Sequence, residues 1–320
     1  MRLLVFVDTN VDITSGSTAR PYTQLNSAGA AIQTVAVPIY TRRLSPSTGS
    51  VLAGFSDVNA WYHSLAVSVR KPLSYGVEVL ANYTWAKTMD GGQVSGVNGT
   101  FNGTDTPIDP FARGSRLGRG AEYSRSDLDQ RGRFVGSVVA TSKLPLGNRF
   151  AAYAANGWQL SGTFTAQTGF PLTALLNNSP VSAIGDGGLT GAALSLNNSG
   201  TPGRVPDQIA RRNAFPGPGV HNLDARVSRL FPFFREGMHL ELAAEAFNVV
   251  NHRNILAVSQ VAYSYVAVST PTARTACTLS PATSAGCILP YTATPFGTPT
   301  STSSVLYGPR QIQLLGKLSF

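Results

Sequence analysis

Three side chains with metal-binding chemistry share one face of an alternating stretch in the C-terminal half of the chain. His239, Glu241 and Glu245 carry imidazole and carboxylate groups that can ligate a cation. The positions between them are apolar, so the pattern favours a polar stripe facing water, and we expect no metal there. Arg226 lies on the matching face of the preceding stretch. We expect it to pair with Glu241 or Glu245 across two neighbouring strands.

Catalytic and cofactor motifs do not stand out. No Ser–His–Asp order supports nucleophilic catalysis, and the glycine runs at 91–92 and 185–188 precede no expected helix, so a phosphate-binding loop is unsupported. We therefore expect neither an enzyme nor a cofactor. A group of charges marks the point where a strand leaves a long connection: Asp127, Asp129, Arg131 and Arg133. Such charges usually lie at a membrane rim, and contact with a ligand is the alternative.

The two cysteines, Cys277 and Cys287, lie in one stretch that is rich in Ser, Thr, Pro and Ala. Further metal ligands are lacking nearby, and two buried free thiols do not suit so polar a segment. A local disulfide formed in an oxidising compartment fits this setting best.

The bulk composition suits a protein whose residues alternate between an apolar and a wet surface. The 320 residues include only 13% charged residues, the mean hydropathy is +0.02 and the net charge is +9. The basic residues are scattered, so we expect no nucleic-acid partner. No apolar run approaches the ~18 residues of a transmembrane helix. The apolar run within the N-terminal MRLLVFVDTN, between Arg2 and Asp8, is shorter than the ~7–15 residues of a signal-peptide core, so we expect the tail of a longer protein or a truncated product.

A two-residue period indicates strands. In WQLSGTFTAQ (158–167), Trp158, Leu160 and Phe164 fall on one face, and Thr163 and Gln167 fall on the other. The same period recurs in six further stretches: 61–70, 75–87, 133–144, 222–231, 238–248 and 311–320. Most of these stretches are about 10 residues long, which is the length that a tilted transmembrane strand needs.

The connections between these stretches alternate in length. Short ones are expected at 71–74, 145–157 (with its own turn at 146–148) and 232–237, and long irregular ones at 89–130, 168–220 and 249–310. Outer-membrane barrels have short periplasmic turns and long outer loops. We therefore predict an all-β, antiparallel transmembrane β-barrel segment of about eight strands. Residues 61–320 form this segment, and residues 1–60 contain a first strand at 3–8 and an outer loop at 9–60, with a strand segment at 31–37.

Six segments, in this order, resemble the barrel of Oar-like TonB-dependent receptors. They are YHSLAVSVRKPLSYGVEVLANYTWAKTMD (62–90), DLDQRGRFVGSVVATSKLP (127–145), GWQLSGTFTAQTGFPLT (157–173), HNLDARVSRLFPF (221–233), LELAAEAFNVVNHRNI (240–255) and PRQIQLLGKLSF (309–320). Together they cover about a third of the chain. The alternating residues Leu314, Gly316, Leu318 and Phe320 also resemble the signal that the outer-membrane assembly machinery recognises.

The resemblance implies a barrel of about 22 strands with an N-terminal plug, which imports scarce ligands with energy from the TonB complex. It places the chain in the outer membrane of a Gram-negative type of cell, as the C-terminal part of such a receptor without plug or signal peptide. The expected partners are outer-membrane lipid and the barrel assembly machinery, and the TonB complex only through a missing plug. Four polar residues are expected to face the lumen: Arg226, Glu241, Glu245 and Lys317.

Three other readings remain open. The main alternative is a small closed outer-membrane barrel with a structural or adhesin role, since about eight strands suffice to close one. An outer-membrane hydrolase would need a Ser–His pair at one rim, and the sequence offers none that is convincing. A soluble secreted β-protein would not place five or more apolar side chains on an outward face in strand after strand.

Overall fold

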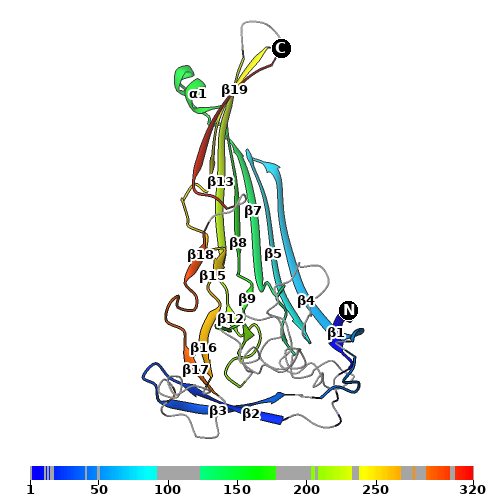
Figure 1. The fold of residues 1–320 in the computed structure, drawn as a ribbon. Coiled ribbons are helices and arrows are strands. Elements are labelled where there is room, and N and C mark those ends of the chain that lie inside the picture. The colour runs from blue at the N-terminus through cyan, green and yellow to red at the C-terminus, as the bar shows by residue number, and fades with distance from the viewer. Residues whose placement is uncertain are drawn as a thin grey trace.

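A computed structural model describes residues 2–10, 12, 14, 18–39, 42–48, 51–91, 123–177, 203–205, 208–232, 238–267, 277, 286–302 and 307–319. Two β-sheets dominate these residues (Figure 1). One is tall and contains the long strands, and we call it the large sheet. The other, the loop sheet, lies at the end of the large sheet where the long connections gather.

The large sheet is antiparallel throughout, with the strand order β1-β4-β5-β7-β8-β13-β14-β19 and β6 paired to β5. Its strands are β1 (Arg2–Asp8), β4 (Leu52–Ser74), β5 (Val77–Asp90), β6 (Ser124–Arg125), β7 (Gly132–Thr141), β8 (Trp158–Gln167), β13 (Val220–Pro232), β14 (His239–Phe247) and β19 (Gln311–Ser319). Apart from β6, the strands of the large sheet lie in it in their order along the chain, as in an up-and-down barrel wall, with the strands of the other sheets inserted between some of them. The predicted all-β class with a long antiparallel sheet is confirmed.

The register brings most of the large apolar residues of the paired long strands onto one face. Leu160 on β8 lies opposite Ala140 on β7 and Val227 on β13. Three residues further along β8, Thr163 lies on the other face, opposite Ser137 and Asp224. We call these the apolar face and the polar face. The large side chains of the apolar face are exposed, Leu314 by 83%, so a surrounding apolar medium must cover them.

The short connections differ in detail from the expected turns. The predicted turn at 71–74 is wrong, because β4 continues to Ser74 and the chain reverses at Tyr75 and Gly76, both with positive φ (51° and 76°). Such a pair suits the tight two-residue turn of a β-hairpin. A Cβ at Gly76 would lie 2.6 Å from the Thr141 carbonyl oxygen, so only glycine fits.

The next connection contains a helix that the alternating pattern did not predict. Helix α1 (Arg149–Ala155) begins after Asn148, whose side-chain oxygen accepts hydrogen bonds from the amides of Phe150 (2.9 Å) and Ala151 (3.2 Å). This is ordinary N-capping. Within the described residues, no helix is long and apolar enough to cross a membrane.

The loop sheet assembles segments that the sequence suggested were irregular. Its order is β11-β10-β16-β17-β2-β3, with parallel pairs at β10–β16 and β17–β2. Its strands are β2 (Thr18–Leu25), β3 (Ala31–Ile39), β10 (Leu175–Asn177), β11 (Gly203–Arg204), β16 (Val261–Ala267) and β17 (Gly286–Pro290). Two small ladders join β9 (Pro171–Leu172) to β12 (Phe215–Pro216) and β15 (Ala257–Val258) to β18 (Pro299–Ser301). The expectation of irregular connections at 168–220 and 249–310 is therefore wrong for these strands.

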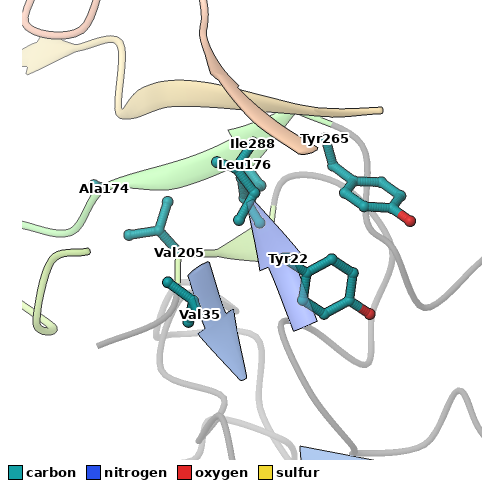
Figure 2. Packing of buried hydrophobic residues seen from close by; sticks show 7 residues of the cluster. All are labelled: Tyr22, Val35, Ala174, Leu176, Val205, Tyr265 and Ile288. Atoms are coloured by element: carbon teal, nitrogen blue, oxygen red, sulfur yellow. The ribbon is translucent and has the colours of Figure 1, made fainter. Parts of the chain in front are cut away.

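The buried hydrophobic cluster belongs to the loop sheet. Figure 2 shows its members Tyr22, Val35, Ala174, Leu176, Val205, Tyr265 and Ile288. The rings of Tyr22 and Tyr265 meet edge to face with 5.7 Å between their centroids. In the described part of the large sheet, only Ala86, Val220 and Ala243 are buried apolar residues. The loop sheet thus has an inward core of the kind found in water-soluble proteins.

The face assignment predicts how the large sheet responds to a new charge. Leu160→Arg or Leu242→Arg should destabilise the folded protein by roughly 2–4 kcal/mol, because the cation would lie among lipid chains. Thr163→Arg, on the polar face opposite Asp224, should cost much less. The free energy of unfolding, measured by denaturant titration in lipid vesicles, checks this. Equal losses for Leu160→Arg and Thr163→Arg would contradict the assignment.

Candidate functional site

The charged residues predicted for the lumen gather on the polar face of β13 and β14. The Arg226 guanidinium donates from Nη1 to Glu245 Oε1 and from Nη2 to Glu241 Oε1, each over 2.6 Å. The three side chains are 25–35% exposed. Lys317 on β19 is the cross-strand partner of Glu241, but no ion pair joins them in the described structure. Two carboxylates therefore share the Arg226 guanidinium, and Lys317, directly across from Glu241, supplies the second cation that balances their charge.

A hollow of about 230 Å³ adjoins this cluster on β7, β8, β13 and β14. Its lining combines the apolar side chains of Val139 and Phe247 with hydroxyl and charged groups: Ser137, Ser161, Thr163, Asp224, Arg226 and Glu245. The Asp224 carboxylate is already held, accepting hydrogen bonds from Asn222 Nδ2 (2.9 Å) and the Asn248 amide (2.8 Å). These groups can bind water or a polar solute by hydrogen bonds.

Three asparagines in the FNVVNHRN stretch fasten the chain where it leaves β14. Asn248 and Asn251 both have φ of 51°, a conformation that asparagine tolerates better than most residues. Asn248 Nδ2 donates to the carbonyl of Gly308 (3.0 Å), and the Asn254 side chain exchanges two hydrogen bonds with the backbone of His221 (2.8 and 2.9 Å). The i, i+3 spacing of these asparagines indicates such a set of side-chain-to-backbone hydrogen bonds, which the sequence analysis did not predict.

A buried polar network joins a loop segment to the end of β5. Arg212, only 1% exposed, forms an ion pair with the buried Asp90 and lies 3.6 Å from Asp127. The next residue, Asn213 (φ 56°), accepts a hydrogen bond from Thr173 Oγ1 (2.9 Å) and donates its amide back to the same oxygen (3.0 Å). The rim of the large sheet is therefore tied by hydrogen-bonded charges to the segment between β11 of the loop sheet and β12.

Asp129 organises a second charged group at the same rim. Its buried carboxylate accepts hydrogen bonds from the Thr88 amide and from Nε of Arg125 (2.8 Å) and Arg131 (2.6 Å). Burial alone would raise the pKa of Asp129, but these hydrogen bonds and the Arg131 charge outweigh it and lower the pKa below its ordinary value. The carboxylate thus stays ionised and holds the two arginines side by side.

Cys277 and Cys287 are joined by a disulfide, with their Cα atoms 6.0 Å apart. Both are buried, and they pack with Leu25, Val266 and Leu289 beside the loop sheet. Cys287 lies on β17 opposite Val266. The bond therefore attaches residue 277 to the middle of the loop sheet.

The residues proposed as an assembly signal lie on β19. Leu314, Gly316 and Leu318 occupy the apolar face, opposite Ala244, Leu242 and Leu240 of β14. Phe320 lies outside the described residues. Among the described strands, β19 pairs only with β14, so its second edge is open.

Comparison with known proteins agrees with this geometry. The family model described as "Outer membrane beta barrel domain" matches residues 14–313. No curated protein and no solved structure matches the chain.

Arg226 and Glu245 should be energetically coupled. A double-mutant cycle with Arg226→Gln and Glu245→Gln should give a coupling of about 1 kcal/mol, because the pair is only partly exposed. Lys317→Gln with Glu241→Gln is the matched control, since this opposed pair forms no ion pair, and its coupling should be near zero. Urea titrations at low and high salt supply the measurement, with the first coupling falling as salt screens it. Similar coupling free energies in both pairs would show that the observed Arg226 ion pair adds no stability beyond that of two opposed charges.

The disulfide should form in exported protein. Trypsin leaves both cysteines in the peptide spanning residues 275–310, which should then be two hydrogen atoms lighter than its reduced form. On the chain-entropy model, so short a closure stabilises by roughly 2–3 kcal/mol at most. The double variant C277S/C287S should therefore make the loop sheet easier to proteolyse and leave the large sheet protected. Two freely alkylated thiols in exported protein would refute the bond.

Proposed function

The chain belongs to the outer membrane beta barrel domain family, and from this premise we propose that it forms the C-terminal part of the wall of a TonB-dependent receptor for ligand uptake. It resides in the outer membrane. The proposed role is to bind and admit a ligand, and no catalytic step is assigned to it. The observation that carries the proposal is the number of strands at the level of the membrane.

Seven strands of the described structure cross the level of the apolar face: β4, β5, β7, β8, β13, β14 and β19. The eighth, β1, pairs only with Leu52–Asn59, which lies beyond the point where β4 begins to pair with β5 at Ala60. With an odd number of antiparallel strands, closing β4 onto β19 would force a parallel pair. Bacterial single-chain barrels instead have even numbers of antiparallel strands. Further strands would complete the wall without this conflict.

The open edges add a strong energetic reason for completion. In lipid an unpaired backbone N–H or C=O costs several kcal/mol, because no water replaces the missing hydrogen bond. Residues 60–74 of β4 and all of β19 offer such edges within the described structure. A wider barrel pairs both edges with new strands and leaves the lumen wet.

The polar face also favours a wide lumen. In an eight-stranded barrel the interior is just filled by side chains. Here the polar face carries Arg226, Glu241 and Glu245, with a hollow beside them. These groups suit a water-filled space or the polar surface of a plug. The loop sheet at the outer end supplies a folded platform on which a ligand can first bind.

The second candidate is a small closed barrel with a structural or adhesin role. It is favoured by the count of eight strands along the sheet. The two candidates differ in what faces Thr163: a plug in the receptor, and only the chain's own side chains in the small barrel.

A photo-cross-linking amino acid at Thr163, in the bacterium that encodes the protein, distinguishes the candidates. On the receptor proposal, irradiation should attach Thr163 to peptides of a plug domain, identified by mass spectrometry. The matched control is the same amino acid at Leu160, which faces lipid and should give no protein adduct. If Thr163 reacts only with residues of the described strands, the lumen is closed and narrow, and the receptor proposal is wrong.

A further inference from the structure

A pocket opens on the apolar face at the outer ends of β5, β7, β8 and β13, outside the lumen. Its volume is about 610 Å³. Its floor is one transverse row of four cross-strand partners, Tyr83, Phe134, Ala166 and His221. This row belongs to the same face as Leu160, so the pocket opens toward the surrounding lipid.

Glycines make one wall of the pocket. Gly169, Gly217 and Gly219 line it where the chain leaves β8 and returns to β13. A Cβ on Gly169 would lie 2.2 Å from the Pro218 carbonyl oxygen, and one on Gly217 would lie 2.2 Å from that of Phe170. The two segments can approach this closely only without side chains, and the space beside them stays open.

Two arginines line the outer edge of the pocket, Arg125 and Arg131. Each uses Nε to bind the one carboxylate of Asp129. Their Nη groups make no hydrogen bond within the described part of the chain, and the side chains are 24% and 33% exposed. Two guanidiniums against one carboxylate leave a net positive charge, with donors free to bind an anion.

We propose that this pocket binds a phosphorylated glycolipid of the outer leaflet, with its phosphate on Arg125 and Arg131 and an acyl chain along the row from Tyr83 to His221. Guanidinium groups bind phosphate through paired, charge-assisted hydrogen bonds. A soluble anion would make no contact with the apolar floor, and a neutral lipid would leave the arginine donors without an anion. The combination selects an amphiphile with an anionic head. The proposal rests on the family and on this geometry, not on the receptor role.

Binding of lipid A to the full chain, purified in detergent, tests the headgroup contact. Native mass spectrometry should detect retained lipid A, with much weaker retention of the same lipid after dephosphorylation. Arg131→Gln should weaken binding about tenfold, the effect of losing one charge-assisted contact. This variant keeps the Arg125–Asp129 pair. The matched control is Arg133→Gln, since Arg133 lies on the polar face opposite Thr84 and Gln167 and does not line the pocket.

Filling the floor tests the acyl-chain contact. Ala166→Trp should abolish lipid retention, whereas Ala140→Trp, on the same face at the short-turn end of β7, should not. A melting curve for each variant confirms that it is folded. Equal effects of Arg131→Gln and Arg133→Gln would overturn the proposal. So would displacement of the lipid by millimolar inorganic phosphate, because the site would then be one for a free anion.

Discussion

The backbone of a membrane-spanning sheet must satisfy its own hydrogen bonds, because hydrocarbon offers none. This constraint accounts for the continuous antiparallel ladder from β4 to β19. Once every strand is paired, its side chains point alternately to the two faces of the sheet. The register must then place apolar side chains beside apolar ones and polar side chains beside polar ones. Leu160 opposite Ala140 and Val227 is one such row, and Thr163 opposite Ser137 and Asp224 is another. A shift of one residue in any pair would expose a polar row to lipid.

The same constraint explains why the hydrophobic core lies in the loop sheet and not in the large sheet. A sheet that is apolar on its lipid side and wet on the other has no dry interior of its own. The long connections, however, meet in water, where burial of apolar groups is favourable. Tyr22, Leu176 and Ile288 come from three distant segments and form that core in the loop sheet. The Cys277–Cys287 disulfide cross-links two segments of this region. The ion pair of Arg212 with Asp90 attaches a neighbouring segment to the rim of the large sheet.

The sequence predicts what is local and periodic. Trp158–Gln167 is β8 with the same bounds, and the pairing of Arg226 with Glu245 follows from their facing positions. The second bond of Arg226, to Glu241, reaches four residues along β14, to a residue that faces Leu230. The loop sheet was not predictable in this way, because β10 and β11 are too short to show a period and two of its pairs are parallel. The extension of β4 before Trp61 lacks contrast between its faces. The lipid-facing pocket could not be predicted either, because its floor is formed by one residue from each of four strands and the pattern within a single strand does not show it.

Arginine has a different role at each of two sites in the large sheet, and the role depends on how many carboxylates bind it. On the polar face Arg226 is shared by Glu241 and Glu245, so both of its Nη groups are already bound to carboxylates. At the rim a single carboxylate, Asp129, is shared by Arg125 and Arg131 through their Nε groups, so their Nη donors are left over. An excess of cations beside an apolar row suits the boundary between anionic headgroups and acyl chains. Paired charges among hydroxyls suit water, and the sheet keeps these two environments apart.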